Sequence, residues 1–208
     1  MITVGNNSVA HWLMKNNAKT GEDKFRICQY LCATGRNGNV FMDHRPNIYL
    51  DTSVPNFLFA DDSPEKKEVT IDFFENFIGK GRFKAYISSL VITEIENTQD
   101  PLKRIQLIDS LSKYPIEIIA LDNFDEIEKL AQKYIDSGVI PVRKIMDALH
   151  VAVCTIYGIN ILVSWNFKHL ANINREYKIR SVNYQNNYFN ELRIITPIEM
   201  VDYGNEDI

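Results

Sequence analysis

The stretch that decides the fold is Asn47-Ile48-Tyr49-Leu50-Asp51-Thr52-Ser53. Its first four residues form a short apolar run between Pro46 and Pro55, and this pattern predicts a buried strand. Asp51 comes where that strand should end, and a carboxylate in this position faces the crevice in which open α/β sheets bind ligands. Asp, Thr and Ser are also common helix N-caps. The stretch alone therefore leaves two roles open for Asp51, a site residue or the cap of the next helix.

Beyond this stretch, apolar strands alternate with amphipathic helices, which predicts an α/β fold. We expect a central parallel sheet of about five strands, right-handed crossovers and helices on both faces. The helix near residue 105 shows Leu102, Ile105, Ile108 and Leu111 at a spacing that suggests one buried face. The expected strands are 47–50, 83–88, 116–121, 159–164 and 194–195, and the expected helices are 53–60, 65–78, 90–98, 101–114, 124–137, 142–157 and 167–173, with 179–190 unassigned.

Length and charge restrict the class of protein. The 208 residues suit one large domain or one domain with an appendage. We divide the chain into an N-terminal extension of unknown role (1–46) and a main domain (47–208). A hydrophobic share of 45% is enough for a sizeable core. The net charge of −4 argues against a strongly basic nucleic-acid binder, although it is compatible with a local basic patch.

The cysteines and the hydropathy favour a soluble cytoplasmic protein. The three cysteines, Cys28, Cys32 and Cys154, lack the spacing of a disulfide framework and suit a reducing compartment. Cys28 and Cys32 lie one helical turn apart, but without a second pair nearby they are a weak zinc signal. The chain has no apolar run of about 18 residues, so we expect no association with a membrane.

Polar residues from four distant parts of the sequence fall at one rim of the expected sheet. Asp51 ends the first strand, Glu94 follows the second and Asn166 follows the fourth. Asp147 begins the apolar helix that runs back toward the fourth strand, so it belongs to the same rim. Each residue also has a structural explanation: a cap for Asp51, Asp147 or Asn166, and a solvated helix position for Glu94.

Clustered carboxylates indicate a particular chemistry. They repel one another and raise each other's pKa unless a cation lies between them. Their hard oxygen atoms suit Mg²⁺ or Mn²⁺, which activate water and shield the leaving oxygen when a phosphodiester is cleaved. An acidic protein can therefore act on an acidic polymer.

Four short motifs then resemble one family. They are Leu50-Asp51-Thr52-Ser53, Ile87 to Ile95, Asp147-Ala148-Leu149-His150-Val151-Ala152 and Ile161 to His169. In order and spacing, from Ile48 to about Val201, they resemble PIN domains, and most nearly the VapC-type ribonuclease toxins of type II toxin–antitoxin systems. The resemblance implies a PIN-like α/β/α sandwich with a five-stranded parallel sheet, and a Mg²⁺- or Mn²⁺-dependent endoribonuclease.

The resemblance also implies a site and partners. The metal-binding and catalytic acids would be Asp51, Glu94 and Asp147. A fourth catalytic position, usually Asp in the family, is Asn166, which has one carbonyl oxygen and no charge and so is a weaker ligand for a hard cation. The implied partners are an RNA substrate and a cognate antitoxin protein, with a homodimer as a further possibility.

Other polar and aromatic residues have two interpretations each. Ser53 is expected to hydrogen-bond a carboxylate or a phosphate, and Glu96 is the rival of Glu94. His150 is either a packed helix residue or a partner of a carboxylate, and Trp165 is either core or a stacking platform for a base. The remaining residues are Lys168 and His169, for RNA phosphates or a solvated face, and Phe73, Phe74 and Phe77, for the core or an interface.

Three functions follow. We favour a metal-dependent endoribonuclease that is the toxin of a toxin–antitoxin pair. The alternative is a catalytically weak PIN-like module that binds RNA or an antitoxin, and Asn166 is its main support. A haloacid-dehalogenase-type phosphatase also places an Asp after its first strand, but it requires a second Asp where this chain has Ser53.

Overall fold

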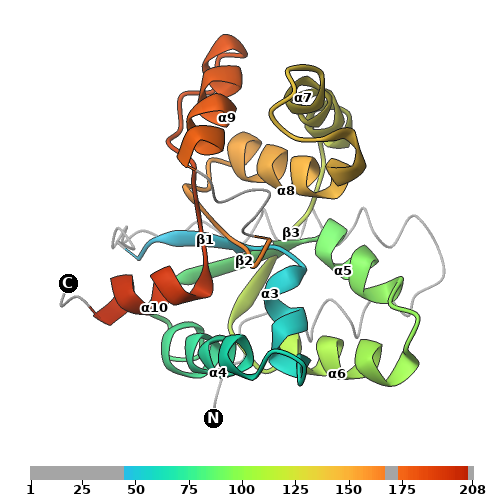
Figure 1. Cartoon of the computed structure of the whole chain (residues 1–208), viewed down its shortest axis with the longest axis vertical. Helices are drawn as coiled ribbons and strands as arrows, with labels where there is room; N and C mark the ends of the chain where they lie inside the picture. Colours follow the sequence, from blue (N-terminus) through green and yellow to red (C-terminus); the bar gives the residue numbers. More distant parts are fainter. Residues whose placement is uncertain (1–44, 167–172, 206–208) are drawn as a thin grey trace, which may run out of the picture.

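The computed structural model describes residues 45–166 and 173–205, and these residues form an α/β fold around a parallel sheet (Figure 1). All five strands pair in parallel in the order β3-β2-β1-β4-β5. The strands are β1 (Asn47–Leu50), β2 (Lys84–Ser88), β3 (Ile116–Ile119), β4 (Ile161–Val163) and β5 (Arg193–Ile195). The predicted five-stranded parallel sheet is confirmed, with the opening stretch as its central strand.

Helices cover both faces of this sheet, as predicted. Figure 1 shows α7, α8 and α9 on one side of the sheet, and α3, α4, α6 and α10 on the other. The helices are α3 (Ser53–Asn56), α4 (Pro64–Asp72), α5 (Ser89–Glu96), α6 (Pro101–Ser112), α7 (Phe124–Asp136), α8 (Ile145–Ile156), α9 (Ile173–Gln185) and α10 (Pro197–Asn205), with the 3₁₀ turns η1 (Phe57–Phe59) and η3 (Val142–Lys144) and the π-helical turn η2 (Phe73–Ile78).

Two of these helices add to the sequence-based prediction. Helix α9 ends at Gln185, so it covers only the first part of the unassigned region 179–190, and α10 was not predicted. A capping box begins α10: Thr196 N donates to Glu199 Oε2 at 2.7 Å, and Glu199 N donates to Thr196 Oγ1 at 3.3 Å. Pro197 at the first helical position reinforces this start.

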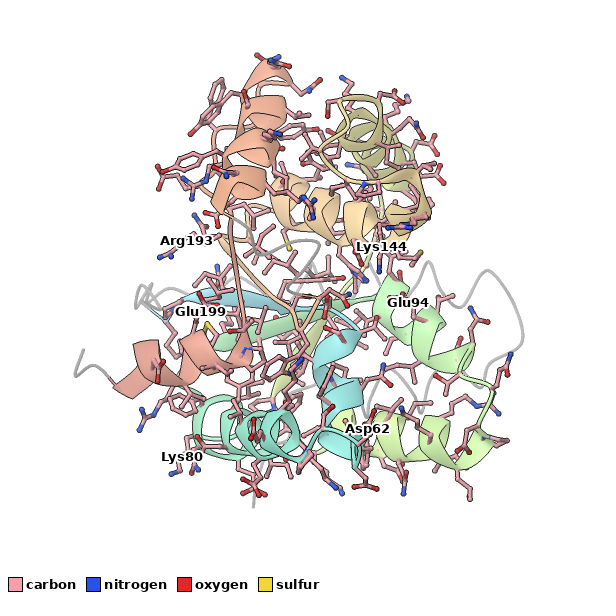
Figure 2. All side chains as sticks on the ribbon, in the orientation of Figure 1. Asp62, Lys80, Glu94, Lys144, Arg193 and Glu199 are labelled. Carbon is pink, nitrogen blue, oxygen red and sulfur yellow. The ribbon has the colours of Figure 1, made fainter. Side chains whose placement is uncertain are left out.

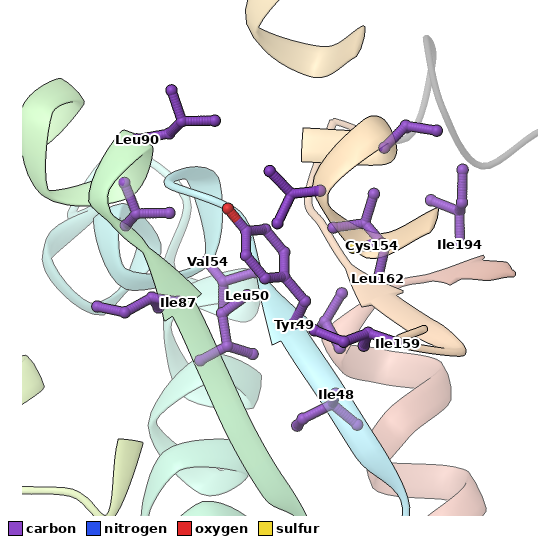
Figure 3. Close-up of a cluster of buried hydrophobic side chains, with 14 of the residues drawn as sticks. Ile48, Tyr49, Leu50, Val54, Ile87, Leu90, Cys154, Ile159, Leu162 and Ile194 are labelled. Atoms are coloured by element: carbon purple, nitrogen blue, oxygen red, sulfur yellow. The ribbon is translucent and has the colours of Figure 1, made fainter. Parts of the chain in front are cut away.

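The core forms where the central strand meets the helices (Figure 3). Ile48, Tyr49 and Leu50 are completely buried, as expected for a strand covered on both faces. Phe73, Phe74 and Phe77 are also buried, so they belong to the core and not to an interface. Trp165 is core too, because its indole N–H donates to Thr70 Oγ1 at 3.0 Å and its ring packs against Phe57.

The predicted buried face of α6 is wrong. Leu102 and Ile105 are 73% and 55% exposed, whereas Leu107 and Leu111 are fully buried. A helix advances about 100° per residue, so successive steps of three residues drift by about 60° each. Three such steps, from Leu102 to Leu111, therefore lead to the opposite side of the helix.

Some expectations concern parts of the chain that the structure does not describe. Residues 1–44 of the proposed extension, including Cys28 and Cys32, lie outside the described residues, and so do Lys168 and His169. Among the helices that are described, none has the length and apolar character needed to cross a membrane.

The orientation of α6 can be tested by paired substitutions. Leu111→Ala removes a fully buried side chain and is expected to lower the free energy of unfolding by about 2–5 kcal/mol. Leu102→Ala lies on the exposed side and should change it by less than about 0.5 kcal/mol. Chemical denaturation measures both, and equal losses would contradict this orientation.

Candidate functional site

The candidate site lies where the strand order of the sheet reverses. Strand β1 has β2 on one side and β4 on the other, so the chain leaves the central strand in both directions. Open α/β sheets bind ligands at this point, outside the carboxyl ends of the strands. Asp51 follows β1 and Ser164 follows β4, and the Asp51 backbone N–H still donates to Val163 O at 3.2 Å. The two residues thus stand side by side at the switch point.

Hydrogen bonds hold the buried carboxylate of Asp51 on both of its oxygens. The side chain is 1% exposed. Its Oδ1 accepts from the Ser53 backbone N–H at 3.0 Å and from the Ser53 hydroxyl. Its Oδ2 accepts from Ser164 Oγ at 2.5 Å. The N-cap of α3 is Thr52, so Asp51 is not the cap of that helix. Its bond from Ser53 turns the chain at the end of β1 and holds a carboxyl group at the rim.

Burial controls the ionisation of Asp51. Loss of hydration raises the pKa of this carboxyl, and the nearby Asp147 raises it further. The charge of His150 and the hydroxyls of Ser164 and Ser53 act in the opposite direction, but the net pKa remains above its ordinary value. The site thus stores unfavourable electrostatic energy that a cation would relieve.

Ser164 connects Asp51 to two further candidate residues, Asn166 and Asp147. Its Oγ accepts from the Asn166 backbone N–H at 2.9 Å. The Asn166 side-chain amide then donates from Nδ2 to Asp147 Oδ1 at 3.3 Å. Asp147 lies in the first turn of α8, and Lys144 Nζ is 3.9 Å from its Oδ2. The structure therefore brings Asp51, Asp147 and Asn166 together.

Glu94 joins the group from α5. Its Oε2 accepts from the hydroxyl of Thr52, the neighbour of Asp51, and lies 2.9 Å from His150 Nε2. Burial alone would raise the pKa of Glu94, but the hydrogen bonds and charge of His150 and the bond from Thr52 lower it overall. Its rival Glu96 is exposed, so the structure favours Glu94. Figure 2 shows Glu94 and Lys144 on facing elements at one side of the molecule.

His150 has both of the roles considered from the sequence. It is a packed helix residue, 3% exposed, and it also contacts a carboxylate. Its other nitrogen, Nδ1, lies 2.8 Å from the Tyr49 hydroxyl, which lies 2.6 Å from Ser88 Oγ. Burial raises the pKa of Tyr49 well above its ordinary value, so this hydroxyl stays protonated. The chain from Ser88 through Tyr49 and His150 fixes the orientation of Glu94.

Sequence-based reasoning missed four of these hydrogen-bonding residues. They are Tyr49, Thr52, Ser88 and Ser164. Three of them had a usable signal, because Thr52, Ser88 and Ser164 each stand at or just after the end of a predicted strand. Tyr49 had no such signal, because an aromatic residue in a buried strand is ordinary.

The side chains of the candidate site are of the kind that binds a divalent cation, but they are not grouped around a common point. Three carboxylates and one amide at a buried rim are the ligands that Mg²⁺ and Mn²⁺ prefer. Among the described residues, however, no three His, Cys, Asp or Glu side chains are grouped closely enough to hold a metal ion. Hydroxyl and imidazole donors instead engage Asp51 and Glu94. Binding a metal would therefore require these side chains to exchange their present hydrogen bonds for contacts with the ion.

Comparisons with known proteins give similarities to solved structures alone. No protein-family model matches the chain, and no curated protein matches it. Among solved structures, the chain is similar to one described as "Crystal structure of VapBC2 from Rickettsia felis bound to a DNA fragment from their promoter". The identity is 16% and the TM-score 0.47, over 72% of this chain and 98% of that chain. This similarity is too distant to assign a family or a function.

The buried charge of Asp51 should reduce stability. Because its folded pKa is raised above the ordinary 3.8, the folded state binds the proton more tightly, and the cost is full at pH values above the folded pKa. Asp51→Asn should therefore raise the free energy of unfolding at pH 7 by about 1 kcal/mol. The gain should shrink as the pH falls through the folded pKa toward 3.8.

Urea denaturation across this pH range measures the effect. The matched control is Asp61→Asn on the exposed surface, where Lys67 lowers the pKa of the carboxyl. Its effect should be small and opposite in sign. The account would be contradicted if Asp51→Asn lowered the free energy of unfolding by an amount that does not vary with pH.

The contact between His150 and Glu94 gives a second prediction. His150→Leu removes the hydrogen bond and the charge that lower the pKa of Glu94, so that pKa should rise. His150→Gln places an amide N–H in a similar position and should retain part of the lowering. Carbon-13 NMR titration of the Glu94 carboxyl measures both variants. An unchanged Glu94 titration in His150→Leu would show that the contact is not formed in solution.

Proposed function

We propose that this chain is a metal-dependent endoribonuclease that hydrolyses RNA phosphodiester bonds with Mg²⁺ or Mn²⁺. The observation that supports the proposal most is the meeting of Asp51, Glu94, Asp147 and Asn166 at the switch point of the sheet. Hydrogen bonds through Ser164 link Asp51, Asn166 and Asp147, and Glu94 accepts from Thr52, the neighbour of Asp51. A buried carboxylate with a raised pKa costs stability even when it is hydrogen-bonded, and such groups cluster at functional sites.

Each residue has a proposed role. Asp51, Glu94 and Asp147 would hold the ion, which when bound supplies an activated water and shields the leaving oxygen. Ser53 and Ser164 orient Asp51, and His150 orients Glu94. Asn166 directs its amide nitrogen to Asp147, so we propose that it positions this carboxylate and does not bind the metal. Partners of this kind typically change metal affinity or activity by about 10–100-fold.

The resemblance of the four sequence motifs to PIN domains supports a more specific proposal. The chain would be the toxin of a type II toxin–antitoxin pair, with RNA as its substrate and a cognate antitoxin protein as its inhibitor. A homodimer is a further proposed assembly, and the cysteine usage and hydropathy support a cytoplasmic location. The α/β/α arrangement is compatible with such a domain.

One alternative has an observation in its favour. A catalytically weak PIN-like module would bind RNA or an antitoxin without efficient cleavage. The amide of Asn166 adds no negative charge, and the carboxylates are not grouped as ready metal ligands among the described residues. One measurement, the rate at which the protein cleaves RNA, distinguishes an efficient nuclease from this binding module.

RNA cleavage with a chelator control tests the proposal. The wild type should cleave single-stranded RNA with Mg²⁺ or Mn²⁺ and lose this activity with EDTA. Asp51→Asn and Glu94→Gln should each lose more than the roughly 10–100-fold that a supporting residue contributes. Glu96→Gln is the matched control, because it changes an exposed Glu on the same helix and should cleave like the wild type.

Each possible result has a defined meaning. Equal cleavage by the wild type and Asp51→Asn would reject Asp51 as a site residue and indicate a contaminating nuclease. Loss of activity in Glu96→Gln together with normal activity in Glu94→Gln would reject the site. No cleavage of any RNA, with tight binding of RNA or an antitoxin, would favour the binding module.

A further inference from the structure

Exposed aromatic side chains gather on α9 and the segment that follows it. Tyr177, Tyr184 and Phe189 are 63%, 46% and 71% exposed. Tyr177 and Tyr184 lie seven residues apart, so about two helical turns place them on the same side of α9. We call this surface the α9 face, and it consists of Tyr177, Lys178, Arg180, Tyr184 and Phe189.

The aromatic rings of the α9 face are held in fixed positions. Asn187 has a positive φ of 65° and turns the chain back after α9, where Tyr188 N donates to Asn183 O at 3.0 Å. This turn brings Phe189 against Tyr184, with ring centroids 6.1 Å apart and planes only 24° from parallel. The Arg180 guanidinium lies 5.9 Å from the Tyr177 ring centre. A ligand would therefore meet an ordered surface that requires little further ordering.

The charge around the α9 face differs from that of the whole chain. Residues 173–193 contain four basic residues, Arg175, Lys178, Arg180 and Arg193, and two acidic ones, Glu176 and Glu191, which gives a local charge of +2. The whole chain carries −4. Arg193 appears below α9 in Figure 2, at the start of β5. Because Glu176 pairs with Arg180 at 2.6 Å, the exposed Lys178 is the residue that supplies positive charge on the α9 face.

We propose that the α9 face binds single-stranded RNA by base stacking, a proposal that rests on and extends the proposed ribonuclease function. Bases of a single strand expose the ring faces that a duplex conceals. A base would stack on the Phe189–Tyr184 pair, and Lys178 would contact the neighbouring phosphates. Such surfaces combine aromatic platforms with positive charge and tolerate many sequences.

A protein partner fits this surface less well. Among the described residues 174–193, the large exposed hydrophobic side chains are all aromatic, and no exposed Leu, Ile, Val or Met accompanies them. By contrast, α6 exposes the aliphatic Leu102 and Ile105, which provide a matched control surface. A surface of aromatic rings among basic and amide side chains suits the bases and phosphates of RNA. It suits the apolar face of a partner helix less well.

Binding of a fluorescently labelled, unstructured RNA of about 16 nucleotides tests the proposal. The full chain carries Asp51→Asn in every variant, so that the RNA stays intact. Adding Tyr184→Ala with Phe189→Ala should weaken binding roughly ten-fold or more. Phe189→Leu keeps apolar area but loses the ring, and it should also weaken binding. Leu102→Ala with Ile105→Ala should bind like the parent.

Salt dependence tests the role of the positive charge. Lys178→Gln should reduce the slope of log Kd against log salt by about 0.7 for the phosphate contact that it removes. Thermal unfolding verifies that every variant is folded. The cleavage assay uses the wild type and is separate. If the chain binds RNA on the α9 face but does not cleave it, the nuclease proposal is refuted and the RNA-binding proposal stands.

Several results would overturn the proposal. These are no RNA binding by the parent, equal affinity of the parent and the Tyr184/Phe189 variant, or an equal loss in the Leu102/Ile105 control. Full RNA affinity together with conversion of a dimer to monomers would assign the face to a second copy of the chain instead.

Discussion

The buried carboxylate of Asp51 is the constraint on which the rest of the site depends. It lies at the end of the central strand, where loss of hydration raises its pKa and makes its charge costly. The fold accepts this cost because two serine hydroxyls and a backbone N–H surround the group. Ser53 follows in the same turn, whereas Ser164 comes from the adjacent strand β4. Ser53 thus satisfies Oδ1 locally, and the pairing of β1 with β4 brings the Ser164 hydroxyl to Oδ2.

The other polar contacts extend from this centre in two directions. Through Ser164 the network reaches Asn166 and then Asp147 on α8. Through Thr52, next to Asp51, it reaches Glu94 on α5, which His150 holds from the other side. Tyr49 ties His150 to the buried strand itself. Four elements are thus joined by side chains that would otherwise each lose hydration without compensation.

Local patterns predicted most of the fold from the sequence. The apolar run 47–50, closed by prolines, identified the central strand, and the alternation of strands and helices predicted a parallel sheet. The prediction for α6 was wrong because apolar residues spaced three apart drift around the helix by about 60° at each step. Helix α10 was missed although Thr196 and Glu199 form a capping box with a visible signature.

The site was less accessible to prediction because it depends on contacts between distant residues. The positions of Asp51, Glu94 and Asn166 followed from the strands that precede them, and that of Asp147 from the helix that it begins. Hydrogen bonds through Ser164 link Asp51, Asn166 and Asp147, and Glu94 bonds to Thr52 beside Asp51. Their hydrogen-bond partners did not follow, since the contact from Ser164 to Asp51 spans 113 residues and exists only because β4 lies beside β1. The direction of the Asn166 amide likewise depends on α8, which no local pattern specifies.

A crystal structure of the protein with Mn²⁺, located by its anomalous scattering, tests the central claim most directly. The account predicts a manganese peak at the carboxyl end of β1, with oxygen atoms of Asp51, Glu94 and Asp147 as its protein ligands at about 2.0–2.2 Å. Manganese bound only elsewhere on the protein, or no manganese beside Asp51 at a concentration that supports other magnesium enzymes, would contradict it.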